Sequence, residues 1–288
     1  VFHRNLPAGL LSKTGKKQKE FTMKSTNSSM ITLLSIILML MVLYAGAPAQ
    51  QVDVITVNGP ITPMTLKYIS DAVDEAEETG VESLVIQMDT PGGLMQATWS
   101  IDKKILSSGE PVIVYITPSG GRAASAGVYI TYSADLAVMA PSTNLGSAHP
   151  VGMGGQMDTT QVMAEKITND AVAHIKGLAR ERGRNAEWAE EAVRKSVSIP
   201  ADEALKIGVV NYIAEDLREL LEKVDGDTVT IAGSAVRLKT DDAQIKMKPM
   251  SFGYKILDKI ADPNIAYLLM MAGIAGIFFE LRNPGAIF

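Results

Sequence analysis

The order of apolar runs between residues 52 and 140 is the feature that most limits how this chain can fold. Four short runs rich in Val, Ile and Leu predict strands, because such residues suit a parallel strand that is buried on both faces. They occupy residues 52–57, 83–88, 111–116 and 136–140. Segments with helical spacing separate them, and Thr62-Pro63 has the form of a helix start. This alternation predicts right-handed crossovers and an α/β domain.

Further along, the pattern is mainly helical. Helices are predicted over residues 160–182 and 185–195, and a third is ended by Gly208. Residues 209–213 then predict another strand, and Gly233 separates two short runs that predict a hairpin.

Small residues surround one serine in the segment Ser119-Gly-Gly-Arg-Ala-Ala-Ser-Ala-Gly-Val128. Ser125 is expected at the start of a helix that leaves a strand, where free amides and the helix dipole favour negative charge. The amide of Ala126 is therefore a candidate oxyanion donor. Gly92 and Gly93 end the neighbouring strand and offer a second donor, because glycine lets a backbone approach closely. The alternative is a small residue chosen for helix packing beside an ordinary turn.

A serine nucleophile needs a base, and two residues are candidates. Lys166 lies at the edge of the apolar face of the helix predicted over residues 160–182, where partial burial would favour the uncharged amine. A surface lysine paired with Asp170 is the commoner fate of such a residue. His149 follows Gly146-Ser-Ala in a loop, and histidine acts as a base at neutral pH without burial. The residues alone do not choose between these bases.

Composition excludes several classes of function. The chain has no cysteine, which removes disulfides, thiol nucleophiles and cysteine-based zinc sites. Its three histidines show no metal-ligand spacing, so we expect neither a metal nor another cofactor. The net charge is −5 and no basic stripe alternates with aromatic residues, so nucleic-acid binding is not expected.

Both ends carry apolar segments. Residues 31–44 follow a short basic region that begins at Met23 and precede Ala47-Pro-Ala49, which together predict a cleaved signal peptide; an uncleaved anchor is the alternative. Residues 265–279 predict a membrane helix, with a buried core helix as the alternative. Lysines precede this second segment, although positive charge prefers the cytoplasmic side. Asn283-Pro-Gly285 is a turn, from which we expect a truncated membrane region.

Several motifs, taken in order, resemble the NfeD family of membrane-bound serine proteases, which are related to Clp protease and signal peptide peptidase A. The resemblance covers roughly residues 50–288, and the combination is specific although no single motif is. The motifs are Asp89-Thr-Pro-Gly-Gly93, Arg122-Ala-Ala-Ser-Ala-Gly127, Gly146-Ser-Ala-His-Pro-Val151, Lys166-Ile-Thr-Asn-Asp170 and Ala201-Asp-Glu-Ala-Leu-Lys-Ile-Gly-Val-Val210.

The resemblance implies an α/β spiral of the Clp and crotonase type, with Ser125 as nucleophile and Lys166 as general base. Amides near Gly93 and Ala126 are the implied oxyanion donors. Clp protease itself uses a histidine in a loop like that of His149. The implied activity is ATP-independent cleavage of hydrophobic segments in membrane proteins, including stomatin-like partners, by a protein that forms homodimers or larger homo-oligomers.

The expected organisation has four parts: an extension with signal or anchor (1–49), the protease domain (50–240), a linker (241–263) and the start of a membrane region (264–288). The domain is expected at the cell membrane, on its extracytoplasmic side. A non-proteolytic scaffold for a stomatin-like complex is the second hypothesis. A crotonase-like acyl-CoA enzyme is the third, and export argues against it.

Overall fold

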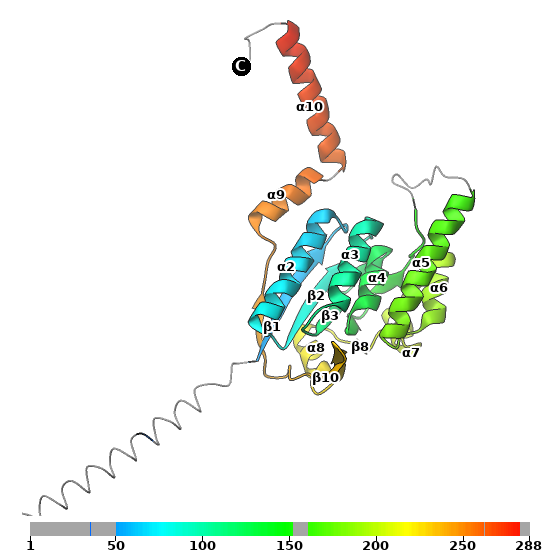
Figure 1. The fold of residues 1–288 in the computed structure, drawn as a ribbon, viewed down its shortest axis with the longest axis vertical. Coiled ribbons are helices and arrows are strands. Elements are labelled where there is room, and N and C mark those ends of the chain that lie inside the picture. The colour runs from blue at the N-terminus through cyan, green and yellow to red at the C-terminus, as the bar shows by residue number, and fades with distance from the viewer. Residues whose placement is uncertain (1–34, 36–49, 152–160, 262, 283–288) are drawn as a thin grey trace, which may run out of the picture. The chain divides into compact units, whose positions relative to one another are not determined.

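The computed structural model describes residues 35, 50–151, 161–261 and 263–282 (Figure 1). The expected signal or anchor segment therefore lies outside the described residues, apart from Ser35. A six-stranded sheet, in which every pair of neighbouring strands is parallel, forms the centre of the domain, in the order β11-β1-β2-β3-β5-β8. Its strands are β1 (Gln51–Asn58), β2 (Ser83–Asp89), β3 (Val112–Ile116), β5 (Leu136–Met139), β8 (Tyr212–Ile213) and β11 (Gln244–Met247). The predicted α/β fold with a parallel sheet is confirmed.

Helices cover the two faces of this sheet unequally (Figure 1). The larger group packs against the main core, and α8 (Leu217–Val224) lies against the opposite face. The larger group is α2 (Pro63–Thr79), α3 (Met95–Leu106), α4 (Ala126–Ser133), α5 (Gln161–Glu181), α6 (Ala186–Arg194) and α7 (Ala201–Lys206). The side chains of β1 alternate between the two cores: Ile55 and Val57 enter the main core, whereas Val52 and Val54 enter the other.

The start of α2 is the one that the sequence predicts. The Thr62 hydroxyl accepts hydrogen bonds from the amides of Met64 and Thr65, and Pro63 occupies the first turn. Gly80 ends the helix with φ 62°, a left-handed conformation that glycine adopts without strain.

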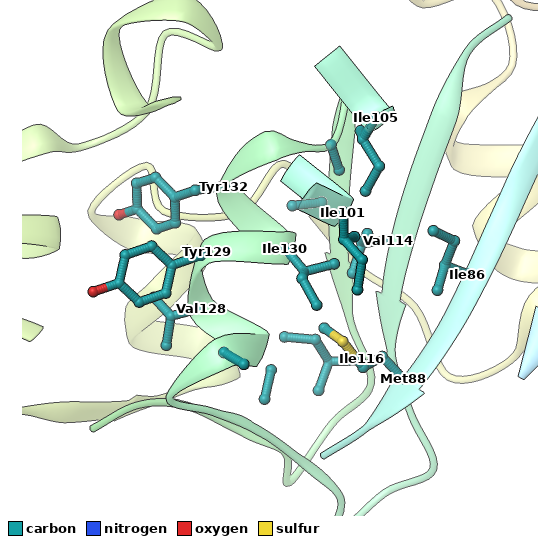
Figure 2. Packing of buried hydrophobic residues seen from close by; sticks show 14 of the residues in the cluster. Ile86, Met88, Ile101, Ile105, Val114, Ile116, Val128, Tyr129, Ile130 and Tyr132 are labelled. Atoms are coloured by element: carbon teal, nitrogen blue, oxygen red, sulfur yellow. The ribbon is translucent and has the colours of Figure 1, made fainter. Parts of the chain in front are cut away.

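α4 is buried along its whole length. All of its residues are buried, so it is a core element with no solvent face. Figure 2 shows Ile130 directed toward Val114 and Ile116 of β3, while Tyr129 and Tyr132 point away from the sheet. The position of the residue just before α4 is therefore fixed by core packing on several sides.

Three-residue strands form a second, smaller sheet, which the bridge between Thr90 and Ala123 joins to the turn after β2. Its order is β4-β6-β7, with β4 and β6 parallel. The strands are β4 (Arg122–Ala124), β6 (Asn144–Gly146) and β7 (Ser198–Pro200). The predicted hairpin is also present, as β9 (Thr228–Ile231) paired antiparallel with β10 (Ser234–Arg237).

The segment expected to be a linker contains ordered structure. β11 pairs in parallel with β1, and the amphipathic helix α9 (Phe252–Ala261) follows it. The apolar segment near residue 270 forms helix α10 (Pro263–Arg282). Within α10, residues Ile265–Arg282 have a mean hydropathy of 1.6 and none is buried, so length and composition make this helix a candidate membrane span.

Candidate active site

The turn after β2 is held against the small sheet. The Thr90 amide donates to the Arg122 carbonyl at 2.8 Å, and the Ala124 amide donates to the Thr90 carbonyl at 3.0 Å. The Thr90 side chain is buried, and its methyl group faces the position where a Cβ on Gly127 would lie, 2.7 Å away. Thr90 thereby joins the turn both to β4 and to the first turn of α4.

Ser125 lies between β4 and α4 in a strained conformation. Its φ is 50° and its ψ is −108°, which non-glycine residues rarely adopt. Its amide donates to the Gly146 carbonyl at 3.0 Å, and its side chain is half-buried. Such strain persists only where the surroundings fix it, and it is concentrated at functional sites. Here the strands and the buried helix α4 supply the constraint.

The predicted turn and the predicted serine are in contact. A Cβ built on Gly92 would lie 2.6 Å from the Cβ of Ser125 and 3.1 Å from its Oγ. The backbone of Gly92, with φ 113°, therefore passes directly beside the hydroxyl. Gly93 is equally constrained from its other side, because a Cβ there would lie 2.2 Å from the carbonyl oxygen of Ile61. No residue with a side chain fits either position without movement of the backbone.

The amides beside Ser125 differ in whether they are free. The Gly92 amide donates to Thr90 Oγ1 at 3.1 Å, so it is already used. The Gly93 amide takes part in none of the hydrogen bonds found among the described residues. Ala126 is the first residue of α4, so its amide has no partner within the helix. Among the described residues, the amides of Gly93 and Ala126 thus remain the candidate oxyanion donors, and Gly92 supplies the close approach to Ser125.

Lys166 lies in the second turn of α5 and is exposed. Its expected partial burial is not found, because the buried side chains of α5 begin only at Ala171. Among the described residues Lys166 also forms no ion pair with Asp170, the alternative partner that the sequence suggests. On the apolar edge where Lys166 was predicted to lie, Met163 is exposed and Ile167 is half-buried.

His149 is held in a defined orientation. Its side chain is half-buried, and its Nδ1 lies 2.8 Å from the Val193 carbonyl oxygen. Because a carbonyl only accepts, Nδ1 carries the proton of this bond, which leaves Nε2 as the basic nitrogen of the neutral ring. The loop itself is tied to α4, since the Tyr129 hydroxyl donates to the Ala148 carbonyl at 3.2 Å.

Thr90 is a site residue that the sequence reasoning missed. It stands inside Asp89-Thr-Pro-Gly-Gly93, and a buried hydroxyl two residues before a glycine turn is a recognisable signal for a side chain that shapes the turn. No cluster of three or more His, Asp or Glu side chains suited to a metal ion occurs among the residues that the structure describes.

Comparison with known proteins gives a consistent likeness. The family model described as the N-terminal domain of NfeD1b matches residues 51–234. The membrane-bound protease PH1510 of Pyrococcus horikoshii is 37% identical over 255 residues, which are 88% of this chain and 58% of that protein. Membrane protein NfeD1b of Bacillus subtilis is 27% identical over 257 residues, 84% of this chain and 54% of that protein. The chain therefore spans little more than half the length of these relatives.

Solved structures of a related protease are similar in fold. A mutant of 1510-N, a membrane-bound stomatin-specific protease, in complex with a substrate peptide gives a TM-score of 0.69 at 36% identity, covering 74% of this chain and 99% of that one. A second mutant gives 0.66 at 36% identity, covering 71% and 100%. In the first mutant a lysine is replaced by alanine, and in the second a serine is replaced.

Proposed function

The chain belongs to the NfeD family, and on that premise we propose that it is a membrane-associated serine endopeptidase with Ser125 as nucleophile. The observation that carries this proposal is the backbone of Gly92 lying against the strained Ser125, with the free amide of Gly93 beside it. Two donors at the point where a carbonyl oxygen becomes negative are what acyl transfer requires, and each contributes roughly 3–4 kcal/mol to barrier lowering in proteases.

In the proposed reaction, Ser125 Oγ attacks the peptide carbonyl carbon while its proton moves to the base. The carbonyl oxygen becomes an oxyanion held by the amides of Gly93 and Ala126. The C–N bond then breaks, the leaving amine takes the proton from the base, and an acyl-serine forms. Water repeats the attack with the same base and releases the second product.

We assign the base to Lys166, with His149 as the alternative. Support comes from the related protease: its replaced serine and lysine are separated by the same number of residues as Ser125 and Lys166. An amine must be uncharged to take the proton, and exclusion of water favours that form. Because Lys166 is exposed in the isolated chain, we propose that bound substrate or a second copy of the chain covers it.

The proposed substrates are hydrophobic segments of membrane proteins, including stomatin-like partners. The stomatin specificity of the related protease 1510-N supports this class, as does the candidate span α10. No cofactor or ATP is required by the chemistry. The export signal predicted before residue 50 supports an extracytoplasmic protease domain, and self-association into homo-oligomers belongs to the same proposal.

Labelling of the full chain with a fluorophosphonate tests the site. We expect wild type to be labelled, Ser125→Ala to be unlabelled, and Lys166→Ala to be labelled at least 100-fold more slowly, as for the loss of a general base. His149→Ala should label like wild type, and Lys206→Ala, another exposed helical lysine, serves as the matched control. Loss of labelling in His149→Ala alone would transfer the base role to that residue.

A scaffold without protease activity is the second candidate, and the exposure of Lys166 is the observation that favours it. Cleavage of an apolar peptide by full-length protein in proteoliposomes separates the two. Turnover that disappears in Ser125→Ala supports the protease, whereas no labelling and no turnover in wild type supports the scaffold.

A further inference from the structure

Helix α9 has an apolar face that no described part of the chain covers. Phe252 is 79% exposed, and Ile256, Leu257 and Ile260 are exposed as well. Phe252, Ile256 and Ile260 are spaced four residues apart, so they form one stripe along the helix. The sequence sets Lys255 and Lys259 among these residues, a composition typical of helices that lie in a membrane interface.

The other side of α9 is fixed to the protease domain. Met250 and Tyr254 pack against the main core. The Tyr254 hydroxyl donates to Asp71 at 2.7 Å, and the Lys67 amine lies 5.6 Å from the centre of the Tyr254 ring. Both partners belong to α2, so the orientation of α9 on the domain is defined by a hydrogen bond and a cation–π contact.

Chain continuity limits how far this face can be from a bilayer. The apolar stretch Ile265–Arg282 of α10 begins a few residues after α9 ends, and its length of roughly 27 Å is close to the thickness of a hydrocarbon core. Wherever α10 enters the membrane, the C-terminal end of α9 lies within a few residues of the membrane surface. A face of four side chains on so short a helix is also small beside the roughly 800 Å² per partner of a stable protein interface.

We infer that the exposed face of α9, formed by Phe252, Ile256, Leu257 and Ile260, is inserted into the bilayer interface and sets the orientation of the protease domain. Lys67 lies in the second turn of α2 and Asp71 at the midpoint of this helix, which starts just after the bridge between Ile61 and Gly93. The α9 contact therefore lies on the half of the domain nearer to the strand ends that carry Ser125. The strand ends that carry Ser125 then face the membrane, from which an apolar substrate segment emerges. This role of the orientation in substrate access rests on the proposed function.

The absence of cysteine makes the test direct, since single cysteines can be labelled with an NBD fluorophore in the full chain. Quenching is compared at three exposed positions: Ile256→Cys on α9, Ser119→Cys at the strand ends near Ser125, and Ser107→Cys at the opposite ends of the strands. Ile274→Cys on α10 reports insertion of the span. Each protein is reconstituted in vesicles of phosphatidylcholine and phosphatidylglycerol containing lipids with nitroxides near the headgroup or deep in the chains.

We expect headgroup nitroxides to quench the label of Ile256→Cys at least threefold more than that of Ser107→Cys, with Ser119→Cys between them. Deep nitroxides should quench Ile274→Cys.

Equal quenching of Ile256→Cys and Ser107→Cys overturns the inference, and so does an unquenched Ile274→Cys. Stronger quenching at Ser107→Cys than at Ser119→Cys overturns the orientation. Disulfide linkage of two Ile256→Cys chains without lipid quenching shows that a second copy covers the face instead. These readouts measure position alone, so their failure is distinct from a failure of the proposed protease activity.

Discussion

At the scale of single residues, Thr90 connects the parts of the site that must act together. Its hydroxyl accepts from the Gly92 amide at 3.1 Å and its methyl group packs under Gly127. Its backbone pairs with β4 directly before Ser125. Both proposed oxyanion donors, Gly93 and Ala126, therefore adjoin atoms that touch Thr90.

Thr90→Val should slow fluorophosphonate labelling roughly tenfold or more and lower kcat with little change in KM. Without the Thr90 hydroxyl the turn after β2 changes shape, and the Gly93 amide, a proposed oxyanion donor, moves from its position. The buried Gly92 amide also loses its acceptor, which should lower the free energy of unfolding by about 1–3 kcal/mol. Labelling rates, peptide kinetics and denaturant titration measure these effects.

Thr90→Ser is the matched control, since it keeps the hydroxyl and removes the methyl group. It should retain most of the labelling rate. A Thr90→Val protein as active as wild type would show that the turn holds its shape without the hydroxyl.

At the scale of elements, α3 and α5 are joined by a pair between a buried aspartate and a half-buried histidine. His174 Nε2 lies 2.8 Å from Asp102 Oδ2, and Asp102 is wholly buried. Burial raises the pKa of Asp102 to about 6, although the hydrogen bond from His174 opposes this rise. α5 is the helix that carries Lys166, so this pair also anchors the segment bearing the proposed base.

The raised pKa has a defined effect on stability. Because the native state binds the Asp102 proton more tightly than the unfolded chain does, the contribution of this group to the unfolding free energy falls as pH rises from about 4 to about 6. The full change is about 3 kcal/mol. Asp102→Asn should remove this pH dependence. The unfolding free energy of the variant should therefore rise relative to that of wild type between about pH 4 and pH 6, and the difference between the two proteins should become constant above pH 6.

Denaturant titrations in detergent at several pH values measure this, with the fluorescence of Trp99 and Trp188 as the signal. Asp241→Asn, at an exposed position, controls for the change in net charge. A parallel pH dependence of Asp102→Asn and wild type would contradict the prediction.

Elements also show how far the sequence could be read. Strands β1, β2, β3 and β5 and the start of α2 were predictable because runs of Val and Ile and the Thr62-Pro63 cap are local signals. β11 was not predicted, since it lies in the segment that was expected to be a linker. β4 carries no such signal: Arg122–Ala124 is a strand only because it pairs with β6 and with Thr90. Helix α8 was not predicted, although its start carries a local signal. The Asp216 side chain is the N-cap and accepts hydrogen bonds from the amides of Arg218 and Glu219.

The candidate site divides in the same way. The approach of Gly92 to Ser125 followed from glycine beside a strand end, so it could be predicted. The use of the Gly92 amide by Thr90 depends on a side-chain rotamer, and the exposure of Lys166 depends on how far α5 extends past the core. Neither of these is a local property of the sequence.

At the scale of the whole molecule, the segment that leads to α9 is fixed by charge to β1, the strand next to the edge of the sheet. Lys248 Nζ lies 3.1 Å from Asp53 Oδ2, and Asp53 is buried in β1. Lys248 also pairs with Glu75 of α2, and its carbonyl accepts from the Tyr68 hydroxyl at 2.5 Å. The stability of the domain and the attachment of the segment that leads to α9 are therefore coupled.

Lys248→Met should lower the unfolding free energy by about 3 kcal/mol, because a buried carboxylate loses its ionic partner. Asp53→Asn combined with Lys248→Met should recover part of that loss, since the uncompensated charge is gone. Lys246→Met, at an exposed neighbouring position, is the control. Denaturant midpoints of wild type, Asp53→Asn, Lys248→Met and the double variant measure the coupling between the two side chains, and additive effects of the two substitutions would argue against it.

The parallel pairing of β1 with β11 has a mechanical consequence. The chain enters the domain at the beginning of β1, and the end of β11 leads to the segment that holds α9, so tension between the beginning of β1 and the end of β11 slides the two strands along each other. Such loading strains all the rungs of the ladder simultaneously, whereas antiparallel neighbours pulled from one end would open one rung at a time. A domain that is pulled through these two points therefore resists mechanical unfolding by shear.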